Sequence, residues 1–132
     1  MILTSKGRYA VIAVVDISNQ PINKPITLAM IAKKNNISIS YLEQIFIKLK
    51  KSNIVKAIRG PGGGYVLGRN GSDINIADIM KAIDEPIKIT NCQGKKNCGK
   101  DLSQCRTHHL WHGLEKKIYQ YLESISVPDI CR

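Results

Sequence analysis

The sequence predicts a mainly α-helical domain with one small β-hairpin, followed by a loop and one long helix. Three observations support this prediction. Apolar residues recur at helical spacing in four segments between residues 4 and 84, and residues 54–67 instead show a short alternating pattern around a run of glycines. A further helical stripe covers residues 110–127, beyond a loop that carries three cysteines. At 132 residues, the chain has the length of one domain with an appendage.

The charge of the chain indicates a polyanionic partner. Twenty Lys and Arg against ten Asp and Glu give a formal net charge of +10, and such a surplus favours phosphate backbones or anionic lipid. No stretch resembles a membrane anchor, since the early apolar run over residues 10–15 is short and is interrupted by Asp16. We therefore expect a nucleic-acid partner, no membrane and a cytoplasmic location, where thiols stay reduced.

The first helix is predicted to begin at Thr4 or Ser5, whose hydroxyls can cap free backbone N–H groups, and to end near Ser18. Its inward face is predicted to hold Tyr9, Ile12, Ala13 and Ile17.

Two short helices joined by a turn are expected next. Thr27 can cap a helix over residues 28–34, and Asn35 and Asn36 suit the turn, because asparagine tolerates the left-handed conformation. Ser38 or Ser40 caps the second helix, whose apolar positions are Leu42, Ile45, Phe46 and Leu49. This order is typical of a helix-turn-helix, although a simple helical bundle could show it too.

The segment that follows favours a winged helix. Residues 54–59 alternate, Gly60-Pro61-Gly62-Gly63-Gly64 turns the chain, and residues 65–67 return it. A hairpin directly after the second helix is a wing, and its tip carries Arg59, a residue suited to a narrow minor groove. A phosphate-binding loop is the weaker alternative, since the glycines lack a following Lys-Ser/Thr pair and precede a strand pattern.

The residues expected to meet double-stranded DNA lie on the second helix and the wing. Hydroxyl and amide groups suit base edges and phosphates, and lysines suit phosphates. A carboxylate is repelled by phosphate but accepts from cytosine, so Glu43 is predicted to discriminate between operators. The full set is Ser38, Ser40, Tyr41, Glu43, Gln44, Lys48, Lys51, Arg59, Gly60, Pro61 and Gly62.

A metal site is predicted between the winged part and the long helix. Cys92, Cys98, Cys105 and His108 follow the spacing C-x5-C-x6-C-x2-H, and no CxxC pair of the zinc-ribbon kind is present. Three soft sulfur ligands and an imidazole suit an iron-sulfur cluster, and structural zinc remains an alternative.

The remaining helices are predicted from apolar spacing. Asn75 and Asp78 can cap a helix from Ile76 to about Asp84. In the long helix, ending before Pro128, a stripe of apolar residues needs a surface to bury against, and a second copy of the chain is the favoured partner. The expected dimer interface is Leu110, Leu114, Ile118 and Leu122. These elements divide the chain into a DNA-binding domain (1–85), a metal-binding loop (86–109) and a dimerisation helix (110–127).

Four segments closely resemble the IscR family of bacterial iron-sulfur cluster regulators. They are LTSKGRYA at residues 3–10, SYLEQIFIKLKK at 40–51, RGPGGGYVLG at 59–68 and the Cys-His-Trp pattern at 92–111. The resemblance implies a homodimeric winged-helix transcription factor that controls cluster-assembly genes and receives its cluster from the assembly machinery. It implies one [2Fe-2S] cluster per subunit, held by Cys92, Cys98, Cys105 and His108.

The chain departs from the family pattern in the second cysteine gap, which is about one residue longer, and in a second imidazole, His109, beside His108. The context Thr107 to Trp111 favours His108 as the ligand. The alternatives are the same fold sensing nitric oxide or iron, and an iron-sulfur carrier or scaffold of a different class. No nucleophile and base pair or carboxylate dyad is visible, so no enzyme is expected.

Overall fold

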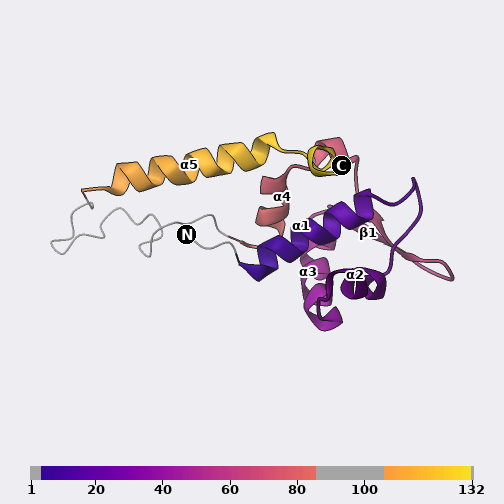
Figure 1. The fold of residues 1–132 in the computed structure, drawn as a ribbon. Helices are drawn as coiled ribbons and strands as arrows, with labels where there is room; N and C mark the ends of the chain where they lie inside the picture. The colour runs from indigo at the N-terminus through magenta and orange to yellow at the C-terminus, as the bar shows by residue number, and fades with distance from the viewer. Residues whose placement is uncertain (1–3, 86–105, 132) are drawn as a thin grey trace.

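A computed structural model describes residues 4–85 and 106–131 of the chain. Its elements follow the predicted order of helices and one hairpin (Figure 1). They are α1 (Ser5–Ser18), α2 (Leu28–Asn35), α3 (Ile39–Lys51), β1 (Val55–Ile58), β2 (Gly64–Leu67), a 3-10 turn η1 (Gly71–Asp73), α4 (Ile76–Ala82), α5 (His108–Ser124) and α6 (Val127–Ile130).

Helix α1 lies at the centre of the core. The Thr4 hydroxyl accepts a hydrogen bond from the backbone N–H of Gly7 at 3.2 Å, which confirms the predicted cap. The predicted inward face is partly wrong, because Ile12 is 37% exposed. The buried face of α1 is rotated from it and consists of Gly7, Ala10, Ala13, Val14, Asp16 and Ile17. Small residues at this face allow the neighbouring helices to approach α1 closely.

Helices α2 and α3 form the predicted helix-turn-helix. Thr27 caps α2, and Asn36 takes the left-handed conformation (φ 54°) that ends it. Ile37 is buried in the turn and Ser38 caps α3, whose buried residues Leu42, Ile45, Phe46 and Leu49 are those predicted. The turn thus holds α3 against the core by one side and leaves its other side exposed.

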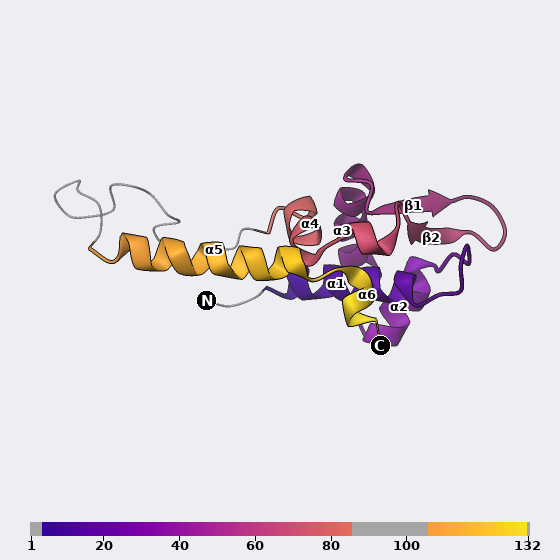
Figure 2. The ribbon, with the colours of Figure 1, turned by 90° about the horizontal axis from the view of Figure 1, so that it is seen from above.

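Strands β1 and β2 pair antiparallel and form the wing (Figure 2). Their register pairs Val55 with Leu67 and Ile58 with Gly64. The wing is joined to the α1–α2 loop by two backbone hydrogen bonds, from Ile26 to Tyr65 at 3.1 Å and from Tyr65 to Ile26 at 2.8 Å. Because Tyr65 pairs with Ala57 near the turn, this attachment holds the turn-side end of the two strands, and only the glycine-rich tip projects beyond it.

Helix α4 is shorter than predicted. The capping box of Asn75 and Asp78 is present, as expected, but the helix ends at Ala82 with Ile83 as its C-cap. Asp84 then takes a positive φ of 57°, which turns the backbone out of the helix.

The C-terminal part differs most from the prediction. Helix α5 begins at His108, two residues earlier than expected, and Pro128 lies within a separate short helix, α6. Val127 of α6 is fully buried in the core of the winged part, and its backbone N–H donates to the Ile74 carbonyl at 3.0 Å. The core is therefore closed by residues from both ends of the described chain.

In the part of the chain that the structure describes, no helix combines the length and the apolar character needed to cross a membrane.

Candidate nucleic-acid interface and metal centre

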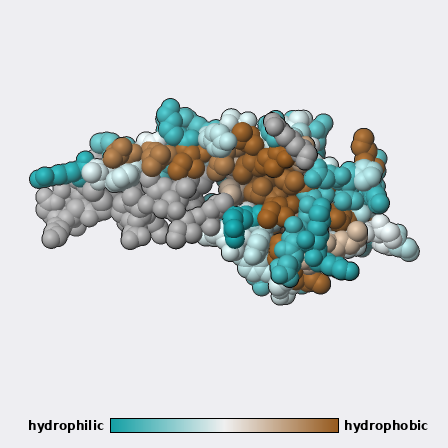
Figure 3. Space-filling view, viewed as in Figure 1, coloured by the Kyte–Doolittle hydropathy of each residue, from teal (hydrophilic) through white to brown (hydrophobic). Residues whose placement is uncertain are grey.

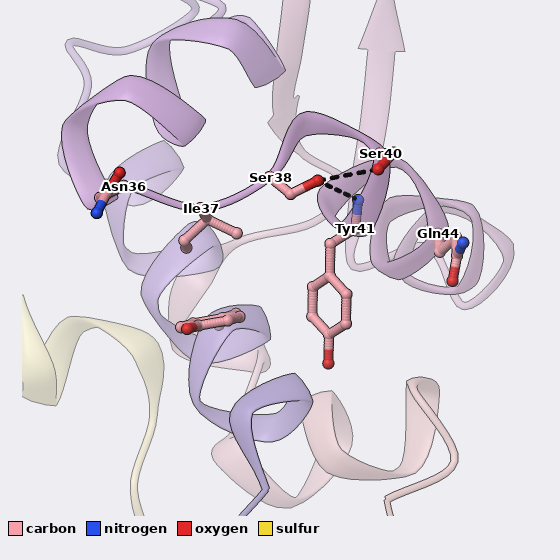
Figure 4. Close-up of a pocket in the computed structure, with 7 residues that line it drawn as sticks. Asn36, Ile37, Ser38, Ser40, Tyr41 and Gln44 are labelled. Atoms are coloured by element: carbon pink, nitrogen blue, oxygen red, sulfur yellow. Dashed lines mark hydrogen bonds between the residues drawn. The ribbon is translucent and has the colours of Figure 1, made fainter.

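The start of α3 borders an open hollow of about 340 Å³. The Ser38 hydroxyl accepts a hydrogen bond from the Tyr41 backbone N–H at 3.4 Å and lies 2.9 Å from the Ser40 hydroxyl (Figure 4). Tyr41 and Gln44 line the same hollow. Four residues predicted to contact DNA are therefore brought together here, with their hydroxyl and amide groups around one surface depression.

Tyr9 of α1 belongs to this surface, although the sequence assigned it only to the core. Its ring meets that of Tyr41 edge to face, with centroids 5.7 Å apart, and both rings are half-buried. The signal in the sequence was a tyrosine on the apolar face, because a tyrosine ring can pack against the core while its polar tip stays near water.

The exposed side of α3 carries the other predicted contacts. The side chains of Glu43 and Lys51 are exposed to solvent. Lys48 differs, because its ammonium nitrogen lies 3.1 Å from the Asp84 carboxylate. In the protein without DNA, Lys48 is therefore already paired with an acidic residue of its own chain.

The wing tip presents Arg59, Gly60, Pro61 and Gly62, and all four are exposed. Gly60 and Gly62 have positive φ angles of 96° and 72°, a conformation that glycine adopts without strain. The tight turn is closed by a hydrogen bond from the Gly63 N–H to the Gly60 carbonyl at 2.9 Å. The sequence of this turn therefore holds the Arg59 side chain at the projecting end of the hairpin.

Helix α3 and the wing are linked through the core. Phe46 of α3 is buried and meets the Tyr65 ring of β2 edge to face, with centroids 4.8 Å apart. Ile54 and Val55, which lead into the wing, are almost fully buried as well. These contacts set the position of the wing relative to α3, so that the two exposed surfaces act as one unit.

The predicted metal ligands Cys92, Cys98 and Cys105 lie outside the described residues. His108 is the first residue of α5 and is half-buried. His109 meets it edge to face at 5.6 Å, and His112 stacks on it with ring centroids 5.9 Å apart. Within residues 4–85 and 106–131, no three metal-binding side chains of the His, Cys, Asp and Glu types come together.

The predicted dimer stripe divides into two parts along α5. Leu110 and Leu114 are 61% and 44% exposed, whereas Leu122 packs against the core of its own chain. Ile118, between them, is half-buried. Figure 3 shows apolar residues running along α5 onto the body of the molecule, and Figures 1 and 2 show the N-terminal half of α5 extending beyond that body.

Comparison with models of protein families shows which family the chain belongs to. The model of Rrf2, described as an iron-dependent transcriptional regulator, matches residues 3–132. The chain belongs to the Rrf2 family. Among its relatives, the HTH-type transcriptional regulator IscR of Xenorhabdus nematophila is 46% identical over all of this chain and 80% of its own length. IscR of Photorhabdus laumondii is also 46% identical, over 98% of this chain and 79% of its own.

Two solved Rrf2-type structures have the same fold. CymR, the global cysteine regulator of B. subtilis, matches with a TM-score of 0.83 and 29% identity, over 99% of this chain and 96% of its own. IscR of T. potens matches with a TM-score of 0.80 and 30% identity, over 98% and 85%. The predicted fold and the predicted resemblance to IscR are confirmed. The chain is a DNA-binding transcriptional regulator of the IscR type, and its relatives are regulators rather than enzymes.

Proposed function

We propose that this Rrf2 regulator senses iron-sulfur cluster supply through a [2Fe-2S] cluster and controls cluster-assembly genes as a homodimer. The observation that carries the proposal is the position of His108, the fourth predicted ligand, at the first residue of the helix that leads into the core of the winged part. A ligand at this place would connect the metal site to the core of the winged part through one continuous helix.

The DNA-binding role is divided between two surfaces. Ser38, Ser40, Tyr41 and Gln44 surround the hollow at the start of α3 and offer groups for base edges. The exposed Arg59 at the wing tip extends to a neighbouring groove, where its charge favours the negative potential of a narrow minor groove. The net charge of +10 adds affinity that does not depend on sequence.

The donor set fits the proposed cluster. Thiolates of Cys92, Cys98 and Cys105 are soft ligands for iron, and the His108 imidazole completes a four-ligand set. When bound, a [2Fe-2S] cluster supplies a redox-active and labile group whose presence reports on cellular supply. The iron dependence in the description of the Rrf2 family supports this assignment, and the assembly machinery is the proposed donor.

Helix α5 would transmit the state of the metal site. Its first residue is the ligand His108, its exposed Leu110 and Leu114 suit a partner copy, and its Leu122 packs against the core. Fixing His108 would therefore reduce the motion of α5 relative to α4 and to the partner copy. The proposed DNA-binding part is residues 1–85, the cluster-binding part is 86–109 and the dimerisation part is 110–127. The buried Val127 anchors the dimerisation part to the DNA-binding part.

The proposal is tested by anaerobic purification followed by DNA binding. We expect visible absorbance with about two irons and two sulfides per chain, a dimer in solution, and a change in affinity for a cluster-assembly promoter when the cluster is removed. His108→Ala should lower the cluster content, and His109→Ala should retain it. A colourless zinc protein with unchanged DNA binding would contradict the proposal, and so would iron-sulfur transfer to acceptor proteins without DNA binding.

A further inference from the structure

Helix α5 carries a pair of imidazoles that the proposed cluster site uses only in part. His108 and His112 stand four residues apart, and their rings are parallel within 6° with centroids 5.9 Å apart. His112 is exposed and His108 is half-buried, so the space beside the two rings is open to solvent. The rings lie on one face of the helix because four residues advance about one turn.

The separation of the two rings suits a shared metal ion. An imidazole nitrogen binds zinc at about 2.0–2.1 Å, so two rings that share one ion have centroids roughly 5 to 6.5 Å apart. The observed 5.9 Å lies within this range. The parallel rings need only rotate about χ2, a broad torsion in histidine, to direct one nitrogen each at the ion. The backbone of α5 does not have to move.

We propose that His108 and His112 form a binding site for a borderline divalent cation, of the zinc or copper class, in the chain that lacks a cluster. Two histidines four residues apart on one helix face supply two of the protein ligands in known helical zinc sites. Imidazole suits Zn²⁺, Ni²⁺ and Cu²⁺, with Cu²⁺ bound most tightly. Water completes the coordination of the ion.

His109 provides an internal comparison. His109 lies three residues before His112, and two histidines at that spacing could also share one metal ion. Its ring, however, meets that of His108 edge to face with centroids 5.6 Å apart, and it is His108 that stacks on His112. The stacked pair is therefore the assigned chelate, and His109 is the matched control.

The site also has a consequence that rests on the proposed function. If His108 is a cluster ligand, a cation held by His108 and His112 and a cluster held through His108 exclude each other. Binding of the cation would then oppose reloading of the cluster, by mutual exclusion at one imidazole.

The test uses the full chain without its cluster, with accessible thiols blocked by N-ethylmaleimide and with Cu²⁺ as the probe. Electron paramagnetic resonance should show two nitrogen ligands. His108→Ala and His112→Ala should each weaken the affinity for Cu²⁺ by at least about tenfold, because each removes one arm of a chelate, while His109→Ala should leave it unchanged. Equal affinity in wild type and His112→Ala, or a loss in His109→Ala alone, would overturn the site.

The blocked thiols hold no cluster, so this result does not depend on the proposed function. The competition between the cation and the cluster is measured in a separate experiment. Its readout is the rate at which iron and sulfide restore visible absorbance in the presence of Zn²⁺. Zinc should slow reloading of the wild-type chain more than that of His112→Ala. Equal slowing in both would overturn the competition, and failure of the wild-type chain to load a cluster would instead overturn the proposed function.

Discussion

The ammonium nitrogen of Lys48 on α3 lies 3.1 Å from the carboxylate of Asp84, the residue that turns the chain out of the end of α4. A lysine expected to neutralise a DNA phosphate is thus paired within its own chain. The Lys48 and Asp84 side chains are 40% and 77% exposed, so the pair contributes little to stability. Its effect is on the charge that α3 offers to DNA.

Asp84→Ala should therefore raise the affinity for DNA by a few fold, because it releases Lys48 and removes a carboxylate that competes with phosphate. The free energy of unfolding should fall by about 1 kcal/mol, because the exposed pair contributes little and alanine tolerates the positive φ of this position less well than aspartate. Asp73→Ala removes the same charge from an exposed position on η1 and is the control for net charge. Fluorescence anisotropy at several salt concentrations measures both variants, and equal gains in the two would contradict the role of the Lys48 pair.

Asp16 holds α1 to the helix-turn-helix. Its side chain is 9% exposed, and its carboxylate accepts hydrogen bonds from the Asn35 amide at 2.6 Å and the Lys34 ammonium at 3.2 Å. Asp16→Ala should lower the free energy of unfolding by about 1–3 kcal/mol, since it leaves the Asn35 amide without this acceptor. Lys34→Ala should cost less than about 1 kcal/mol, because that side chain is mostly exposed. Urea denaturation measures the stability of both variants. Equal losses of stability would contradict the hydrogen bond between Asn35 and Asp16 as the larger contribution.

Gly64 is required by the attachment of the wing. A Cβ at this position would lie 2.5 Å from the Ile26 carbonyl oxygen, and its φ is +152°. Gly64→Ala should cost more than about 2 kcal/mol and loosen the wing. Gly62→Ala places its Cβ in open space at φ +72° and should cost about 1 kcal/mol from backbone strain alone. Thermal unfolding distinguishes them, and the reverse order would show that the Ile26 contact is not tight.

Lys81 of α4 and Tyr119 of α5 connect the DNA-binding part to the long helix. The Lys81 nitrogen lies 4.9 Å from the Tyr119 ring centroid, and hydrogen bonding to Tyr119 raises the pKa of Lys81 above its ordinary value of 10.5. A raised pKa stabilises the folded state fully below pH 10.5, and this contribution is lost as the pH rises through the folded-state value. Tyr119→Phe should lower the pKa of Lys81, seen by NMR titration.

The loss of stability in Tyr119→Phe should accordingly be present at neutral pH and should vanish in strongly alkaline solution. Tyr121→Phe is the matched control, because Tyr121 lies on the same helix and is 65% exposed. A Lys81 titration that is the same in both variants and the wild type would exclude the Tyr119 hydroxyl as the cause.

Glu43 is exposed on α3 next to Gln44, which lines the hollow. Glu43→Ala should broaden the choice of operator, raising affinity for disfavoured sequences by about 1 kcal/mol, or roughly fivefold. Competition between two operators that differ at one C·G pair measures the preference. An unchanged preference would assign Glu43 to a solvated position without a role in sequence choice.

The sequence alone determined the order and type of most elements. The caps at Thr4, Ser38 and Asn75 are local hydrogen bonds between residues three apart, so the chain specifies them without tertiary contacts. The glycine turn and its flanking alternation specified the wing for the same reason. The family resemblance rested on these local segments and was confirmed.

Tertiary structure decided how the elements combine. The sequence placed Ile12 in the core and assigned Lys48 to a DNA phosphate, whereas the structure exposes Ile12 and pairs Lys48 with Asp84. Leu122, which the sequence assigned to a dimer stripe, also packs against the core of its own chain. Each outcome depends on residues distant in sequence. Apolar spacing reveals that a face must be buried, but not which surface buries it, because that is set by the packing of the whole core.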